Sequence, residues 1–199
     1  MPAPSTYSLK EAAAIAGLPE AAVRREVEYG VLRPSTSRRG QRYALRFGAD
    51  IIVYLTMRSA LTVDLDRKDR ASVFRIIVEK VEKAGGWRRD GQRLRKGIVA
   101  IDLSEAKREA SARLKDFEAG RRRVVSSPAI LGGEPVFAGT RLSVRHIGGL
   151  ADRGTPVDEI LADYPALGQG DIRFARMYAR MKPDPGRPRR RLAFRREAA

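Results

Sequence analysis

The chain has 199 residues, of which 40 are Lys or Arg and 24 are Asp or Glu, so its formal net charge at pH 7 is +16. It contains no Cys and a single His, which excludes disulfides, thiolate metal sites, a cysteine nucleophile and the usual histidine-rich metal centres. The excess of cations, most of them arginine, predicts a polyanion or an acidic protein surface as partner, and we expect no cofactor.

The sequence also predicts where the protein works. No apolar run approaches the roughly 18 residues that would span a bilayer. The N-terminal segment MPAPSTYSLKE lacks the basic start of a secretory signal. We therefore expect a cytoplasmic protein without a membrane partner.

The first predicted elements are two short helices joined by a tight turn. Ser8 and Glu11 have the spacing of a capping box, so a helix should cover residues 9–16 and stop before a glycine. Pro19 suits the first turn of a second helix, which should end at Gly30. One face of that helix should be buried, and the opposite face should present Ala21, Arg24, Arg25 and Glu28.

The segment that follows, residues 31–47, should form a basic β-wing. Pro34 and Gly40 disfavour helix, and residues 41–47 have the pattern of a short strand. Five cations within fourteen residues, with no acid among them, should repel one another unless a polyanion meets them. These are Arg33, Arg38, Arg39, Arg42 and Arg46. A solvated loop is the alternative.

Together these elements predict a winged helix-turn-helix with its second helix in a DNA major groove and the wing on the flanking backbone. The alternative is that the helix arginines only form a solvated face with Glu28. The predicted DNA-binding residues are Arg24, Arg25, Arg38, Arg39, Arg42 and Tyr43.

A resemblance supports this prediction. Residues 23–34 resemble the second helix and turn of the mercury-resistance regulator superfamily, and residues 40–51 resemble its wing, so the likeness covers roughly residues 7–60. It implies that Arg24, Arg42 and Tyr43 contact phosphate or face the groove. Arg25 and Glu26 replace the aromatic pair of that superfamily, and its long dimerisation helix is absent. We therefore do not expect its kind of effector sensing.

The middle of the chain, residues 61–123, should connect two units or mediate dimerisation. Asp50 can cap a helix that runs to about Ser59, and a longer helix should cover residues 66–84. The apolar stripe of the longer helix is either a homodimer interface or intrachain core. That stripe consists of Val73, Phe74, Ile77 and Val81.

A basic turn or hairpin over residues 87–96, a strand over 98–103 and a charged helix to about Ala119, capped by Ser104, should follow. Gly120 should close the charged helix. Trp87 stands next to a glycine turn and two arginines, so it is either a local core anchor or a base-stacking residue, and the first is the stronger interpretation.

The C-terminal unit should contain a tight hairpin and three helices. Residues 129–131 and 135–137 flank Gly132-Gly133, which suits a hairpin turn. Ser143 should cap the first helix, Thr155-Pro156 should open the second, and the third should cover about 170–181.

Residues 127–144, with the later Gly154, the segment 159–161 and Tyr164-Pro165, resemble the VapB-like bacterial antitoxin domain known as domain of unknown function 433. The likeness covers about residues 124–182. It implies a three-helix, homeodomain-like unit and, as partner, a toxin of the PilT N-terminal ribonuclease fold. Arg141 should bind a carboxylate or hairpin carbonyls, and the lone His146 should be a packed, hydrogen-bonded side chain rather than a ligand.

The last segment, residues 183–199, should be a disordered arginine-rich arm. In one interpretation it inhibits a toxin by placing arginines in an acidic active site and apolar side chains in a groove. It could instead add phosphate contacts, or remain a solvated tail. The predicted toxin-binding residues are Arg189, Arg190, Arg191, Leu192, Phe194 and Arg195.

The whole sequence thus predicts a mainly α protein with small β elements. We expect a winged helix-turn-helix in residues 1–60, a connecting or dimerisation region in 61–123, an antitoxin-type domain in 124–182 and the arm in 183–199. The predicted function is that of an antitoxin, a homodimeric repressor that binds its own promoter and neutralises a ribonuclease toxin. A stand-alone dimeric transcription regulator is the alternative. No paired carboxylates support an enzyme.

Overall fold

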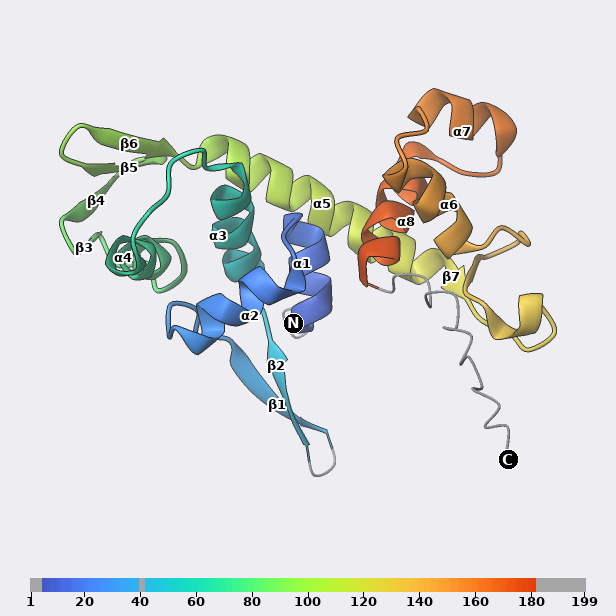
Figure 1. Cartoon of the computed structure of the whole chain (residues 1–199), viewed down its shortest axis with the longest axis horizontal. Coiled ribbons are helices and arrows are strands. Elements are labelled where there is room, and N and C mark those ends of the chain that lie inside the picture. Colours follow the sequence, from blue (N-terminus) through green and yellow to red (C-terminus); the bar gives the residue numbers. More distant parts are fainter. Residues whose placement is uncertain (1–4, 40–41, 182–199) are drawn as a thin grey trace, which may run out of the picture.

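The computed structural model describes residues 5–39 and 42–181, a mainly helical chain with small antiparallel sheets (Figure 1). The N-terminal elements are α1 (Leu9–Ala16), α2 (Glu20–Glu28), β1 (Ser35–Arg39), β2 (Arg42–Arg46), α3 (Ala49–Ala60) and α4 (Arg67–Val78). A four-stranded sheet follows, with β3 (Lys83–Ala84), β4 (Trp87–Asp90), β5 (Arg93–Lys96) and β6 (Val99–Asp102) in that order. The remainder is α5 (Ser104–Arg123), β7 (Val124–Val125), the 3-10 turn η1 (Leu131–Gly133), β8 (Val136–Phe137), α6 (Val144–Asp152), α7 (Val157–Asp163) and α8 (Gln169–Met181).

Helix α5 links the four-stranded sheet to the C-terminal helices. In Figure 1 it runs from the four-stranded sheet to the bundle of α6, α7 and α8. Along the way it packs against α3, α1 and α8. Its buried residues, Ala106, Ala110, Phe117 and Gly120, lie on one face of the helix. Residues of that face belong to one continuous hydrophobic core together with residues of α1, α3 and α8. The predicted domain boundaries at residues 60 and 123 remain predictions.

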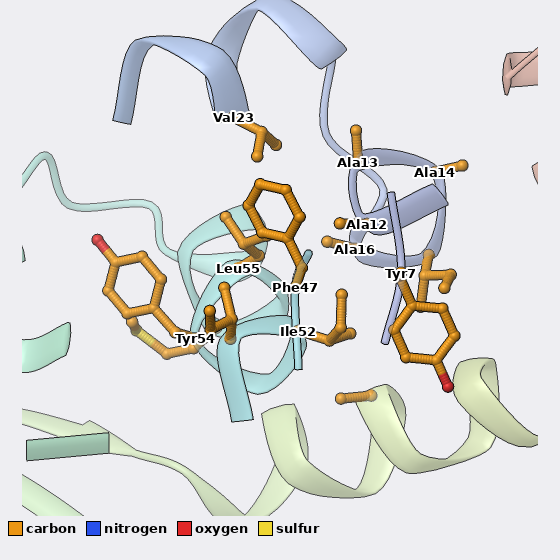
Figure 2. Packing of buried hydrophobic residues seen from close by; sticks show 14 of the residues in the cluster. Tyr7, Ala12, Ala13, Ala14, Ala16, Val23, Phe47, Ile52, Tyr54 and Leu55 are labelled. Atoms are coloured by element: carbon orange, nitrogen blue, oxygen red, sulfur yellow. The ribbon is translucent and has the colours of Figure 1, made fainter. Parts of the chain in front are cut away.

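The core around α1 depends on small side chains. Residues 12–16 of α1 are all buried, and four of these five are alanines, so neighbouring helices can approach closely. Figure 2 shows Ala12 and Ala16 facing Ile52 of α3, with the ring of Phe47 near Val23 of α2. Phe47 and Ile52 are both fully buried. The apolar residues of α1, α2 and α3 therefore form one packed unit.

Several local predictions are confirmed. Ser8 caps α1 as predicted, and Gly17 ends that helix with a φ of 75°. Ser143 caps α6 by accepting from the amide of His146. Trp87 is 1% exposed, which confirms it as a core residue. The strand predicted over 41–47 is found as β2, and residues 35–39 of the predicted wing form its partner strand β1.

Four predicted helix starts were wrong in detail, among them that of α5, whose N-cap is Leu103 and not Ser104. Pro19 and Pro156 occupy the N-cap positions of α2 and α7 rather than the first helical position. The N-cap of α3 is Gly48, and Asp50 lies inside the first turn. Its carboxylate is 2.9 Å from the amine of Lys80. The proline and acidic patterns located the helices but misplaced their caps by one or two residues.

The helix predicted over residues 66–84 was too long. It begins after Asp66 as expected but ends at Val78, and Lys80 then adopts a φ of 60°. Val73, Phe74 and Ile77 are buried within the chain. The stripe is therefore intrachain core and not a free dimer interface, which leaves the homodimer as a prediction without a located surface.

The glycine of α5 has a different role from the predicted one. Gly120 does not end the helix, which continues to Arg123. A Cβ at this position would lie 2.1 Å from the Cγ of Phe174. Gly120 therefore lets the ring of α8 lie directly on the α5 backbone.

The predicted hairpin around Gly132-Gly133 was also wrong. β8 pairs antiparallel with β7, with Val124 opposite Phe137, and not with residues 129–131. The two glycines do adopt positive φ, 63° and 91°, but within the 3-10 turn and its exit. β7 directly follows α5, which brings it next to β8. The local turn pattern at Gly132-Gly133 could not reveal this pairing between more distant residues.

The close contact of α6 with α8 gives a stability prediction. A Cβ at Gly148 would lie 2.1 Å from the backbone oxygen of Ala175, whereas one at Gly149 would meet only the end of the Arg153 side chain, at 3.1 Å. Gly148→Ala should lower the free energy of unfolding by about 1–3 kcal/mol. Gly149→Ala, its neighbour on the same helix, should be neutral or stabilising because alanine favours helix. Urea unfolding of both variants checks this, and equal effects would contradict the packing.

Candidate nucleic-acid interface

The first helix of the N-terminal pair, α1, begins with a capping box. The backbone amide of Ser8 donates to the carboxylate of Glu11 at 2.7 Å, and the Glu11 amide donates to the Ser8 hydroxyl at 3.4 Å. After the turn at Gly17, Val23 points α2 into the core with no exposed surface. The burial of Val23 fixes which face of α2 is turned outward.

The exposed face of α2 is the one that the sequence predicted. Ala21, Arg24, Arg25 and Glu28 are all exposed. The guanidinium of Arg24 lies 2.7 Å from Glu20 one turn earlier, in an ion pair open to water. The side chain of Arg25 has no hydrogen bond or ion pair with the residues that the structure describes. One of the two predicted helix arginines is thus available, and the other is held by a weak surface contact.

The hairpin β1–β2 projects away from the helices in Figure 1. Its register sets Arg38 opposite Tyr43 and Arg39 opposite Arg42, while the side chains of Arg39 and Arg42 lie outside the described part of the chain. Tyr43 is 76% exposed, which is unusual for a large ring in a strand. At the base of the hairpin, Phe47 forms a bridge with Tyr7. The hairpin is therefore anchored at its base, and Arg38 and Tyr43 of its described part are exposed.

The idea that the five hairpin cations lack acidic partners was partly wrong. The guanidinium of Arg33 lies 3.4 Å from Glu79 at the end of α4, far along the chain. Arg46 donates to the hydroxyl of Ser37 at 2.9 Å. The charges of residues 31–47 alone could not reveal this carboxylate, because it belongs to another element. The contact also ties the base of the hairpin to α4.

A buried carboxylate, Glu26, lies behind the exposed face of α2. Its side chain is 2% exposed, and the Nε atoms of Arg58 and Arg70 lie 3.3 and 3.1 Å from its Oε1. The hydroxyl of Tyr54 donates to its other oxygen at 3.4 Å. Burial and the Glu26 charge raise the pKa of Tyr54 well above its usual value, so the phenol stays protonated as a donor. Glu26 therefore joins α2 to α3 and α4.

The sequence singles out Glu26 only as a departure from the pattern of the mercury-resistance regulator superfamily. Its position contained a usable signal, because it follows the core residue Val23 by three and so shares its inward face. A charged residue on an inward face requires a partner of opposite charge. The partners are far away in sequence, and only the structure identifies them.

The predictions for the C-terminal residues His146 and Arg141 are confirmed only in part. His146 is exposed rather than packed, and its ring nitrogen lies 3.2 Å from the hydroxyl of Tyr164, so only the hydrogen bond of the prediction is confirmed. Arg141 was expected to bind a carboxylate or carbonyls, but it is exposed without such a contact among the described residues. The arm residues Arg189, Arg190, Arg191, Leu192, Phe194 and Arg195 lie outside the described residues.

The described residues contain neither a metal-binding cluster nor a membrane-spanning helix. Across residues 5–39 and 42–181, no three His, Asp or Glu side chains come together in a way that could hold a metal ion. In the same residues, no helix is long and apolar enough to cross a membrane.

Comparison with known proteins identifies one segment. Residues 124–179 match the family model described as "Protein of unknown function (DUF433)". The chain is also similar to "Uncharacterized protein y4eO" of Sinorhizobium fredii, with 42% identity over 92 residues. That match covers 46% of this chain and 42% of the relative, so the chain spans less than half of the relative's length. No solved structure matches. The β7–β8 pair and the α6–α8 bundle correspond to the matched segment.

The Glu26 cluster gives the second prediction. Glu26→Gln should destabilise the protein by about 3 kcal/mol, because it leaves two partly buried guanidinium groups without their counter-charge. The matched control is Glu28→Gln on the exposed face of the same helix, with an expected effect within about 0.5 kcal/mol. Chemical denaturation measures both. Similar stabilities for the two variants would mean that Glu26 does not anchor α2.

Proposed function

We propose that the N-terminal unit, residues 5–60, is a winged helix-turn-helix and that the protein is a DNA-binding regulator. In this proposal α2 enters the major groove and the hairpin β1–β2 lies on the neighbouring backbone. The observation that carries it is the outward face of α2, where Arg24 and Arg25 lie opposite the buried Val23 and Glu26.

The chemistry of this face supports DNA as the ligand. Arg25, without an acidic partner among the described residues, has its planar fork available for a base edge or a phosphate. The exposed pair of Arg24 with Glu20 contributes little stability, so a phosphate can replace the carboxylate. On the hairpin, Arg38 and the exposed Tyr43 share a register position, and Arg39 and Arg42 share the next. We assign these six residues to DNA binding.

Rigidity behind the face also supports the proposal. A recognition helix must hold its side chains in register with base edges, and the Glu26 cluster fixes α2 against α3 and α4. Because the site is preformed, binding should require little rearrangement of the helix. Many operators read by such units are two-fold symmetric, so we propose a homodimer on DNA.

The third prediction tests DNA binding by the N-terminal unit. For six to ten phosphate contacts, affinity for duplex DNA from upstream of the gene should fall about 10³- to 10⁵-fold between roughly 50 and 200 mM salt. Arg42→Ala should weaken binding to every sequence, whereas Arg25→Ala should also relax sequence preference. Fluorescence anisotropy with specific and unrelated duplexes measures both effects. Arg153→Ala, which removes an exposed arginine of the C-terminal unit, is the control. Binding unchanged in both test variants would refute the proposed face.

We further propose that the regulator is an antitoxin that neutralises a toxin of the PilT N-terminal ribonuclease fold. The family match at residues 124–179, together with the likeness of that segment to antitoxin domains, supports this role. In this proposal the α6–α8 bundle is a homeodomain-like unit and the arginines of residues 187–196 enter the acidic active site of the toxin. A regulator without a toxin partner, in which the C-terminal unit serves dimerisation, is the second candidate.

The fourth prediction separates these two candidates. Co-expression with the protein encoded next to this gene should yield a stable complex if the protein is an antitoxin. Deleting residues 187–199 should abolish inhibition of the partner's ribonuclease activity and leave operator binding nearly unchanged. Deletion of the five last residues, 195–199, which spares most of the arginines, is a milder comparison. Loss of DNA binding with inhibition retained would instead assign the arm to nucleic acid.

A further inference from the structure

The four-stranded sheet β3–β6 carries a row of cations that the proposed function does not use. The register sets Lys83 opposite Arg88, Arg88 opposite Arg95, and Arg95 opposite Ala100. Residues directly opposite each other point to the same face of a sheet. Lys83, Arg88, Arg95 and Ala100 are all exposed. Trp87, Leu94 and Ile101, on the other face, are buried. Three positive side chains therefore cross three neighbouring strands on the outer face.

Such a row works against the stability of the sheet. Like charges directly opposite each other repel at a separation of about 5 Å. Arg95 is partly balanced by Asp90, 3.2 Å away, and Arg93 on the same face by Asp102 at 3.4 Å. The side chains of Lys83 and Arg88 have no hydrogen bond or ion pair with any residue in the described part of the chain. The outer face thus keeps a net positive charge that the sheet itself does not neutralise.

The fold prevents the cations from moving apart by a change of register. Two-residue turns join the strands, at Gly85-Gly86, Gly91-Gln92 and Gly97-Ile98, and these four glycines all have positive φ. A slip by one residue would also turn Trp87 and Leu94 out of the core. The row is consequently a fixed feature of the surface.

Crowding of positive charge extends to the edge of the sheet. Burial lowers the pKa of Lys107, and the nearby Arg89 and Lys80 lower it further, while Asp50 opposes them. The amine of Lys107 also donates to the side chain of Gln92 in the β4–β5 turn. Arg89 is opposite the buried Leu94, so this second group of cations lies on the face of the sheet away from the row.

The position of the sheet relates it to the proposed DNA site. β3 follows the end of α4, where Glu79 contacts Arg33 at the base of the β1–β2 hairpin and Lys80 contacts Asp50 of α3. In Figure 1, α4 lies between the sheet and α2. The segment between α4 and the sheet is thus tied by ion pairs to the base of the hairpin and to α3.

We infer that the outer face of β3–β6 is a second contact surface for the phosphate backbone of duplex DNA, outside the segment read by α2. The inference rests on the proposed DNA-binding function. Lys83, Arg88 and Arg95 span two interstrand spacings, about 10 Å, which equals about three phosphate steps of one DNA strand along the helix axis. The contacts are to phosphate, so they add affinity and not sequence preference.

The test compares two triple variants of the full-length protein with the same change in charge. The sheet variant is Lys83→Gln, Arg88→Gln, Arg95→Gln. The control is Arg108→Gln, Lys115→Gln, Arg122→Gln, which alters three exposed cations of α5. The sets match closely, since each contains one ion-paired arginine, Arg95 with Asp90 or Arg108 with Glu105. Binding to the upstream duplex and to an unrelated duplex is measured as a function of salt concentration.

In the sheet variant, the slope of log K against log salt should become shallower by about 2 to 3, because each phosphate that the protein no longer neutralises removes about 0.9 from the slope. Binding to both duplexes should weaken by the same factor, and the thermal midpoint should stay unchanged or rise as the like charges are removed. The control should keep the wild-type slope. An unchanged slope in the sheet variant, or an equal change in both variants, overturns the inference. Absence of salt-dependent binding by the wild-type protein would instead refute the proposed function itself.

Discussion

A single buried carboxylate holds the N-terminal half of this protein in its shape. Glu26 brings the guanidinium groups of Arg58 and Arg70 and the hydroxyl of Tyr54 to one place, so that α2, α3 and α4 share one polar contact inside an apolar core. A buried charge is costly when unpaired, so this contact works only if all three helices are in position. The outward direction of Arg24 and Arg25 follows from it, because Glu26 and Val23 determine which side of α2 faces inward.

The second constraint is the continuous buried face of α5. Phe117 forms an edge contact with Tyr7 and a tilted contact with Phe174, with ring centroids 5.9 and 5.7 Å apart. Arg113 donates to the backbone oxygen of Ile15 near the end of α1, at 3.1 Å. Arg123, at the end of α5, pairs with the mostly buried Asp171 of α8. One helix thus couples the N-terminal helix pair to the segment matched by the family model, so the two are parts of one packed body.

Charge is distributed unevenly over this body. Many arginines of the helices are paired with acids on neighbouring turns or helices, as Arg173 is with Asp116 and Arg180 with Asp152. The exposed cations without such a partner in the described residues include Arg25 on α2, and Lys83 and Arg88 on the sheet. A protein of net charge +16 could have spread its excess evenly. The local excess at these positions is what the DNA-binding proposals explain, since phosphates would provide the missing counter-charges.

The amino-acid sequence by itself determined the features that depend on near neighbours in the chain. The capping box of Ser8 and Glu11, the left-handed turn at Gly17 and the outward face of α2 were all predictable, because their atoms lie within a few residues of one another. Only the tertiary structure decided the partners of Glu26, the pairing of β8 with β7 and the contact of Gly120 with Phe174. Each of these joins distant segments, and which distant segment arrives is settled by packing of the whole core and not by local pattern.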